Sequence, residues 1–343
     1  MRTAGRLAFA LTIVVACAHG AEPVSNQEMG CWIPMTNVMA SLGLTHRERL
    51  ADGLVLSNAA HTLHFFAGHR GVSLDGVSVF LHLPPRDASS NDLRDVARVD
   101  YETMLQPILL ATAGPPATLR IVLDAGHGGE DSGARSVAPQ VREKDVTLDI
   151  ARQVAAHVTA AGQQALLTRS RDVTVALGER TRFAAAHQAQ LFVSIHANSS
   201  PTNQFALGAE TYILPVPGFN GLADNTHGPT NACPGNRFDT ANALLGYAIH
   251  RRFAPVTGLD RGLKRARYYV LKEAPCPAVL VECGFLTNTN DATRLGDSVY
   301  RRKLADEIAS GILDYTRLIR LPAQPPPAEA VSLTPPPPTG TPN

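Results

Sequence analysis

From residue 118 onward, apolar side chains recur at two alternating spacings. Short apolar and β-branched runs, typical of strands, are separated by longer segments whose apolar residues repeat at helical spacing. The predicted strands are residues 119–123, 165–168, 191–195, 209–214, 268–271 and 278–281, and the predicted helices are 145–158, 177–187, 240–253 and 300–318. This alternation predicts an α/β domain over 118–320, with a twisted, mostly parallel sheet flanked by helices.

The segment before this domain is patterned differently, in short runs that alternate apolar and polar residues. These runs predict strands at 54–57, 62–68 and 76–84 and helices at 35–42 and 101–109. We therefore expect a small, strand-rich α+β domain at 28–111, followed by a Gly-Pro-Pro break. At the other end of the chain, Pro, Ala and Thr dominate the sequence, which predicts a disordered tail at 322–343.

Residues 1–20 have the layout of a secretory signal. Arg2 and Arg6 precede an apolar run, residues 7–18, that is too short to span a bilayer. Small residues near position 18 suit an ordinary signal peptidase, whereas the sequence Val-Val-Ala-Cys that ends at Cys17 resembles a bacterial lipobox. The protein is therefore expected to be exported to the periplasm or cell envelope, either free or lipid-anchored through Cys17.

Length and charge narrow the class of protein. The chain has 343 residues, enough for about two domains. It has 31 basic and 30 acidic side chains, so a strongly basic nucleic-acid binder is disfavoured. Apolar residues make up 44% of the chain, which allows a sizeable core to be buried.

Four cysteines remain beyond the predicted signal. They are Cys31, Cys233, Cys276 and Cys283, and the sequence alone allows three pairings. Cys233 and Cys276 are the first candidates for a disulfide, because both lie in proline-containing loop segments and an exported protein meets an oxidising compartment. Since no pair has CxxC spacing, a zinc knuckle is not supported.

Two histidines and two glutamates lie where predicted strands end or a helix begins. His127 follows the first strand of the α/β domain and His196 the third, Glu282 ends the sixth strand, and Glu143 stands just before the first helix. In open α/β sheets, chemistry gathers beyond the carboxyl ends of the strands. Three such ligands with an open fourth position would form a catalytic zinc site, and the fourth residue would handle protons.

These four residues lie in motifs that follow one another along the chain. The motifs are GHGGEDSGA followed by Glu143-Lys144, SIHANSS, GAETYIL, RGLKRARYYVLK and VLVECGF. Together they resemble the zinc-dependent N-acetylmuramoyl-L-alanine amidases of the type 3 family, which cleave the amide between muramic acid and the first alanine of the peptidoglycan stem peptide. The resemblance implies that His127, Glu143 and His196 bind zinc, that Glu282 is the catalytic carboxylate, and that peptidoglycan is the substrate.

The chemistry expected of such a site agrees with this resemblance. Zinc held by two histidines and one glutamate lowers the pKa of its water toward about 7, and Glu282 could carry a proton from that water to the leaving nitrogen. Cys283, paired with His196, is a rival nucleophile. Because neighbouring strand residues point to opposite faces, Cys283 is expected to be buried away from a site that Glu282 faces.

The strand-rich region has a weaker signature of its own. Ile33-Pro34-Met35 leads into residues 40–44, and Leu74-Asp75-Gly76 precedes an apolar strand. This pattern resembles the module first described at the N-terminus of copper amine oxidases. It does not imply copper, because His61 and His64 are three apart in a strand-like run and so point to opposite faces. Docking to a polymer or partner is the role that we expect of this module.

Five basic residues near the motifs allow two interpretations, and one long loop adds a separate expectation. The basic residues either contact carboxylates of the stem peptide or form structural salt bridges. They are Arg180, Arg261, Lys264, Arg265 and Arg267. The Gly-, Pro- and Asn-rich loop 215–238 is longer than the connection common in the family, and we expect it to form a rim of the substrate groove, held by Cys233.

The sequence therefore predicts an exported, zinc-dependent peptidoglycan amidase. Two alternatives remain: an inactive wall-binding relative that keeps the fold, and another zinc hydrolase, a peptidase or deacetylase, that acts on the same polymer.

Overall fold

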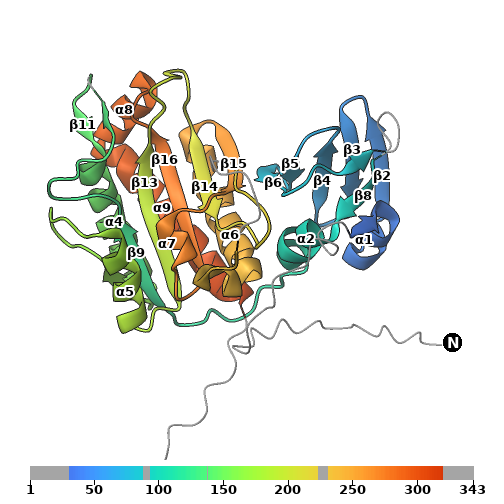
Figure 1. Cartoon of the computed structure of the whole chain (residues 1–343), viewed down its shortest axis with the longest axis horizontal. Helices are drawn as coiled ribbons and strands as arrows, with labels where there is room; N and C mark the ends of the chain where they lie inside the picture. The colour runs from blue at the N-terminus through green and yellow to red at the C-terminus, as the bar shows by residue number, and fades with distance from the viewer. Residues whose placement is uncertain (1–30, 88–92, 137, 223–230, 320–343) are drawn as a thin grey trace, which may run out of the picture.

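The computed structural model describes residues 31–87, 93–136, 138–222 and 231–319. Figure 1 shows a large sheet flanked by helices and, beside it, a smaller strand-rich part. The predicted signal with Cys17, and the predicted tail, lie outside the described residues. Within the described ranges, no helix is long and apolar enough to cross a membrane.

Six strands form the sheet of the α/β part, in the order β12-β9-β13-β16-β14-β15. They are β9 (Arg120–Ala125), β12 (Gln164–Leu167), β13 (Leu191–Asn198), β14 (Ala209–Ile213), β15 (Asp260–Arg265) and β16 (Ala278–Phe285). The first four in this order run parallel, whereas β14 runs antiparallel to β16 and parallel to β15. The expected sheet is thus confirmed, with one reversal of direction at β14.

Helices cover both faces of this sheet. They are α4 (Glu143–Ala160), α5 (Leu177–Ala186), η3 (Pro234–Phe238), α6 (Asp239–Thr257), α7 (Tyr269–Lys272), α8 (Thr289–Gly296) and α9 (Ser298–Leu318). In α4, Val146, Ile150 and Val154 recur at helical spacing and are all buried in the core that also includes residues of α6 and α9. Residues of α5 and α7 belong to a second, smaller core on the other face of the sheet.

The prediction of a strand at residues 268–271 is wrong. Tyr269–Lys272 is a single helical turn, and the missing strand is β15, eight residues earlier in the chain at Asp260–Arg265. The sequence of β15, DRGLKR, looked like a charged loop because three of its six residues are basic. Two of these basic side chains pair with buried Glu210 on β14, which explains how so charged a strand lies inside the sheet.

The N-terminal part begins with the short strand β1, followed by α1 at the predicted position and by a series of antiparallel strands. Its elements are β1 (Trp32–Pro34), α1 (Met35–Leu42), β2 (His46–Leu50), β3 (Gly53–Ser57), β4 (Thr62–Phe66), β5 (Gly71–Leu74), β6 (Val77–Phe80), β7 (Arg86–Asp87), β8 (Leu93–Ala97), α2 (Arg98–Asp100), η2 (Tyr101–Leu105) and α3 (Gln106–Leu109). Strands β2 to β6 pair consecutively. Two histidines of this region pair with separate carboxylates, His61 with Asp75 and His82 with Asp100.

The two parts share one sheet and one core. Val79 of β6 pairs in parallel with Leu263 of β15, so the five consecutive strands extend the α/β sheet to eleven strands. Residues from both parts form a single buried hydrophobic cluster on the face covered by α6 and α9. The backbone N–H of Ser78 also donates to Asp260 Oδ2 at 2.7 Å, which ties the two parts together at the start of β15.

A buried polar cluster completes this junction. His82 and Asp100, whose side chains are fully buried, lie 2.8 Å apart from Nδ1 to Oδ1. The guanidinium of Arg265, from β15, lies 3.8 Å from the same carboxylate. On its other side, His82 Nε2 accepts from the backbone N–H of Val216 at 3.3 Å. His82 therefore connects the N-terminal part to the beginning of the long loop that we expected to line the substrate groove.

Candidate active site

The carboxyl ends of three neighbouring parallel strands form the floor of the candidate site. His127 lies two residues beyond β9, while His196 and Glu282, on β13 and β16, are paired in register. His127 has a φ of 60°, in the left-handed region that non-glycine residues rarely adopt. Its neighbour Gly126 has no room for a side chain, because a Cβ there would lie 2.3 Å from the ring of His196. The glycine therefore lets the two imidazoles approach.

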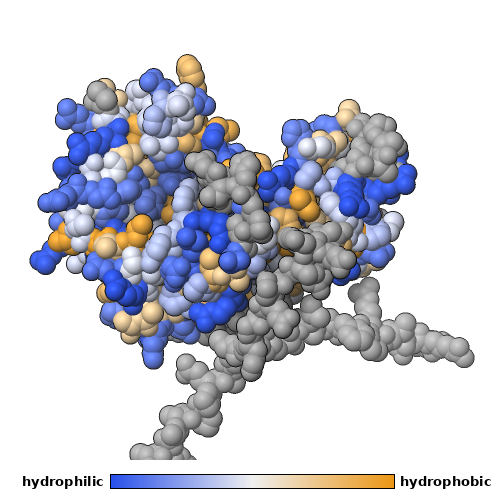
Figure 2. All heavy atoms as spheres, in the orientation of Figure 1, coloured by the Kyte–Doolittle hydropathy of each residue, from blue (hydrophilic) through white to orange (hydrophobic). Residues whose placement is uncertain are grey.

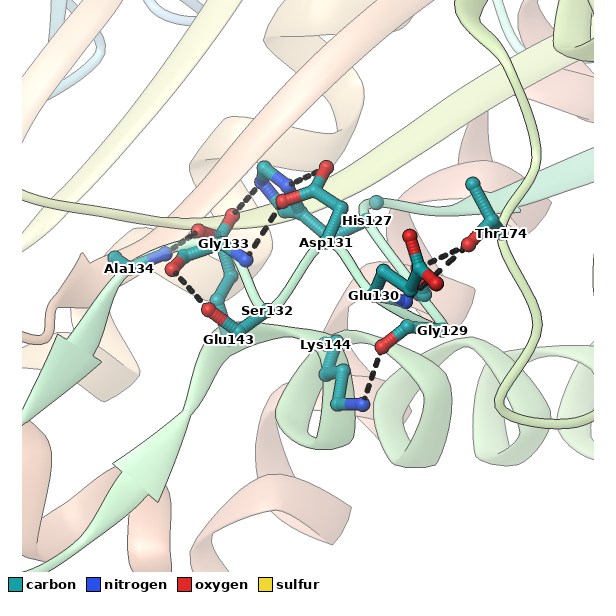
Figure 3. A network of polar contacts seen from close by, with 12 residues as sticks. His127, Gly129, Glu130, Asp131, Ser132, Gly133, Ala134, Glu143, Lys144 and Thr174 are labelled. Carbon is teal, nitrogen blue, oxygen red and sulfur yellow. Dashed lines mark hydrogen bonds and ion pairs between the residues drawn. The ribbon is translucent and has the colours of Figure 1, made fainter.

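The fourth sequence-predicted residue, Glu143, projects into the same space from the start of α4. Its Oε1 lies 3.0 Å from Nε2 of His127 and 2.9 Å from Nδ1 of His196. The backbone N–H of Ala134 donates to its other oxygen at 2.8 Å (Figure 3). Burial alone would raise the pKa of Glu143, but the hydrogen bonds with His127 and His196 more than compensate and hold that pKa well below its usual range.

The geometry of these three residues suits a zinc ion. One ligand atom from each of His127, Glu143 and His196 lies within 4.8 Å of the others. Ligands at about 2.1 Å around a tetrahedral ion are separated by about 3 to 3.5 Å, close to the observed spacings. Two imidazole nitrogens and one carboxylate oxygen are also a known donor set of catalytic zinc. The residues present therefore fit the metal that the motifs imply.

Glu282 is the unpaired carboxylate of the site. It is 7% exposed, and its Oε2 is buried with no hydrogen-bond partner among the described residues. Burial, and then the charges of Glu143 and Glu210, hold the pKa of Glu282 well above its usual value of 4.5. Cys283, the next residue, is 1% exposed in the main hydrophobic core, on the opposite face of the strand. Its thiol is thus buried away from the site, as strand alternation predicted.

Sequence reasoning missed Asp131, which belongs to the first motif. Its Oδ2 lies 2.8 Å from Nδ1 of His127, so the ring nitrogen donates to the carboxylate, and its Oδ1 accepts from the backbone N–H of Gly133 at 3.0 Å (Figure 3). The other ring nitrogen, Nε2, then faces Glu143. A carboxylate in this position orients a metal-binding histidine and selects its tautomer. The spacing of four residues from His127 was the available sequence signal.

Arg180, which also lines the cavity, holds the loop that carries His127. Its guanidinium is 4% exposed and donates to Asp124 Oδ1 and to the carbonyls of Ala125 and His127, at 2.7 to 2.9 Å. A second buried arginine, Arg169, donates to the carbonyls of Ala125 and Gly126 at 2.9 and 2.7 Å. The sequence analysis did not single out Arg169. Two cations thus satisfy backbone carbonyls that the sharp turn leaves unpaired.

The basic loop also forms ion pairs. Arg261 and Lys264 both donate to Oε1 of Glu210, at 2.8 and 2.6 Å, and Arg265 is buried at the junction with the N-terminal part. Glu210 lies directly opposite Glu282 across the strands β14 and β16. Its other oxygen accepts from Asn198 and Tyr212, both at 2.8 Å. The second carboxylate beside Glu282 is therefore fully hydrogen-bonded.

The cysteines and the long loop differ from what we expected. Cys233 and Cys276 are both free thiols, so the favoured disulfide is not formed. The Nη2 atom of Arg267 lies 3.0 Å from the Cys233 sulfur, and Cys276 is 3% exposed within the smaller core. The described residues of the loop 215–238 do not line the cavity around His127, Glu143, His196 and Glu282. Those at its start pack instead against the junction around His82.

The catalytic cavity has a volume of about 500 Å³ and two unlike walls. One wall consists of His127, Asp131, Glu143, His196 and Glu282. The other is built from residues 174–177, which lead into α5, and residues 268–270 at α7. The first group is polar and rich in carboxylates, and the second is uncharged; Arg180 of α5, which also lines the cavity, is the cation among the lining residues.

Comparison with known protein families shows to which family the chain belongs. A sequence model described as N-acetylmuramoyl-L-alanine amidase matches residues 121–314, more than half of the chain. The chain belongs to this family. The match includes all four residues singled out in the sequence, although it assigns no role to any of them.

Relatives of this amidase family cover the same part of the chain. The N-acetylmuramoyl-L-alanine amidase LytC of Bacillus subtilis is 38% identical over 198 residues, which are 57% of this chain and 35% of LytC. The N-acetylmuramoyl-L-alanine amidase AmiA of Escherichia coli is 35% identical over 219 residues, 57% of this chain and 75% of AmiA. This chain thus spans about a third of the length of LytC.

A solved structure supports the fold of the amidase part. The catalytic domain of CwlV, an N-acetylmuramoyl-L-alanine amidase from Bacillus (Paenibacillus) polymyxa var. colistinus, is 32% identical and superposes with a TM-score of 0.50. The superposition covers all of the CwlV domain and 59% of this chain. The large mixed sheet with its helices is therefore the fold of an amidase catalytic domain.

Proposed function

We propose that this protein hydrolyses the amide bond between N-acetylmuramic acid and L-alanine in peptidoglycan, with zinc as its cofactor. The observation that carries the proposal is the convergence of His127, Glu143 and His196 beside the buried, unpaired carboxylate of Glu282. Membership of the amidase family supports the same reaction. In this proposal, the two histidines and Glu143 hold the metal and Glu282 is the catalytic residue.

The residues of the site divide the work between binding and proton transfer. Zinc would supply a Lewis acid that makes water nucleophilic near neutral pH and polarises the scissile carbonyl. Glu282 takes the proton of the attacking water and returns it to the nitrogen of the departing alanine. Its raised pKa suits this task, because a carboxylate with an ordinary pKa would hold a proton too weakly near neutral pH. Asp131 keeps His127 in the orientation that ligation requires.

The setting of the enzyme in the cell is part of the proposal. The layout of residues 1–20 supports export to the periplasm or cell envelope, with lipid anchoring if Cys17 becomes the mature N-terminus. We retain 28–111 and 118–320 as two sequence units, an accessory module similar to that of copper amine oxidases and the amidase domain. We also retain 322–343 as a tail. In the described structure, strands of the two units pair within one sheet, so the accessory module would sit at a fixed position beside the catalytic domain.

Product analysis tests the reaction directly. Purified protein loaded with zinc is incubated with intact sacculi, and the soluble products are identified by mass spectrometry. An amidase frees stem peptides that begin with alanine. Release of peptides cut at another bond, or of acetate, would instead support a peptidase or deacetylase, and no product from zinc-loaded protein would support an inactive wall-binding relative.

Two substitutions separate the assigned roles. Glu282→Gln should bind one zinc ion, measured by elemental mass spectrometry after dialysis, but lose most of its turnover. His196→Ala should lose the metal itself. Glu130→Gln is the control, because it removes an exposed carboxylate from the same motif. An active Glu282→Gln variant would overturn the proton-transfer role and leave the zinc ligands untouched.

A further inference from the structure

The uncharged wall of the catalytic cavity presents large apolar side chains to solvent. Leu177, the first residue of α5, is 57% exposed, and Tyr269, the first residue of α7, is 42% exposed. Both line the cavity, together with Val175, Ala176 and Tyr268. Figure 2 shows apolar patches among mostly polar side chains on the face in view. We call the pair Leu177 and Tyr269 the apolar lip.

The apolar lip is held in place by the elements that carry it. Helices α5 and α7 pack against each other, and Gly178 allows the close approach, because a Cβ there would lie 3.3 Å from the hydroxyl oxygen of Tyr269. Arg180, one turn along α5, donates to the carbonyl of His127 at 2.9 Å. The lip therefore has a defined position relative to the candidate metal ligands, as a subsite of an enzyme requires.

The chemistry of the substrate matches the contrast between the two walls. In the bond that we propose is cleaved, one side carries a pyranose ring, whose C–H faces are uncharged, and the other carries a peptide with charged carboxylates. The lining residues 174–177 and 268–270 carry no charge. The nearest cations are Arg180, which is 4% exposed and bonded to Asp124, and Lys272, whose ammonium lies 6.0 Å from the centre of the Tyr269 ring. A sugar face gains from contact with an aromatic ring and a leucine, whereas these apolar faces offer a carboxylate no hydrogen bond and remove water from it.

We propose that the apolar lip is the subsite for the sugar ring of N-acetylmuramic acid, which places the glycan strand over α5 and α7. This inference rests on the proposed function and adds the direction in which the substrate crosses the site. It predicts that Leu177 and Tyr269 contribute to affinity for the glycan side of the substrate and not to affinity for the stem peptide.

The test compares two ligands that share the amide and the peptide. One is an N-acetylmuramoyl dipeptide, and the other is the matching D-lactoyl dipeptide, which lacks the pyranose. Dissociation constants are measured by calorimetry on the zinc-loaded Glu282→Gln protein, so that neither ligand is consumed. Replacing both lip residues by alanine should weaken binding of the muramoyl ligand about 5- to 10-fold, equivalent to roughly 1 to 1.4 kcal/mol. Binding of the lactoyl ligand should change less than twofold.

Two controls keep the result specific. Tyr269→Phe alone should keep most of the affinity for the muramoyl ligand, because it keeps the ring face. Phe205→Ala, which removes an aromatic side chain that is 89% exposed and does not line the cavity, should change neither constant. The proposal fails if the lip variant weakens both ligands equally or neither, or if the unsubstituted lip binds the two ligands with the same affinity. Failure of the proposed function would appear separately, as absence of cleavage by the protein with Glu282 intact.

Discussion

Acid should weaken the junction between the two parts of the molecule through a single buried histidine. Burial, and then the positive charge of Arg265, lowers the pKa of His82 from 6.5 to about 4, although Asp100 partly offsets this effect. The folded protein therefore keeps His82 neutral at a pH at which the unfolded chain would protonate it. Below about pH 6.5 the unfolded state binds the extra proton, so the free energy of unfolding falls as the pH falls.

The magnitude follows from the size of the pKa shift. The difference of 6.5 − 4, about 2.5 units, multiplied by 1.36 kcal/mol per unit, amounts to about 3 kcal/mol of stability. This stability is fully present above pH 6.5 and is lost progressively down to about pH 4. Asp100, whose pKa is lowered below 3.8, loses its contribution only at still lower pH. Asp239, whose pKa burial raises to about 7, also titrates between pH 4 and 6.5, so the contribution of His82 is obtained from a comparison with a variant that lacks it.

The assay compares the protein with His82→Asn by denaturant unfolding at several pH values between 4.5 and 7. Asparagine can donate to Asp100 but does not titrate. The variant should be less stable at pH 7, because it leaves the N–H of Val216 without its acceptor. Its stability should also depend less on pH, by about 2 kcal/mol over this range. Since the other histidines and the buried carboxylates Asp239 and Glu282 titrate in both proteins, their contributions cancel in the difference. Parallel pH profiles would refute the reasoning.

Three further predictions concern the site and the sheet. Asp131→Asn should weaken zinc binding about tenfold, measured by competition with a chromophoric chelator, whereas the control Glu130→Gln should leave it unchanged. Equal zinc affinities of the two variants would contradict the orienting role of Asp131. Gly133→Ala should also lose zinc, because φ at residue 133 is 60° and the new Cβ would lie 2.5 Å from Oε2 of Glu143. Unchanged metal content would show that the loop can relax. A fragment of residues 118–319 should melt at a lower temperature in calorimetry than the chain 31–319. In the fragment, the edge of β15 and the core beneath it lose their partners. Equal melting temperatures would mean that the junction adds no stability.

The error at β15 shows why the sequence pattern was insufficient there. Alternation of apolar residues identifies a strand only when one face is apolar, and β15 satisfies its charges through Glu210 on the neighbouring strand. The run at 268–271 misleads in the opposite direction, because it is apolar enough for a strand and yet is helical. It packs into the smaller core as one turn of helix, and nothing local distinguishes that turn from a strand.

The candidate site was more predictable than the supports around it. Residues that end parallel strands meet at one edge of a sheet, so the positions of His127, His196 and Glu282 along the chain already implied proximity. Arg180 had no such signal for its contacts. The sequence does not distinguish a buried arginine from an exposed one. Only the fold around Arg180 brings its guanidinium to backbone carbonyls.

By itself, the sequence determined the alternation of strands and helices, the α/β class and the residues available for metal chemistry, because these depend on local periodicity and on which side chains follow which strand. Tertiary structure decided the rest. The reversal at β14, the pairing of β6 with β15, the burial of Glu282 and the neutral state of His82 all depend on contacts between segments far apart along the chain. Burial and pairing set the charge and orientation of a side chain, and neither property belongs to a residue until the chain has folded.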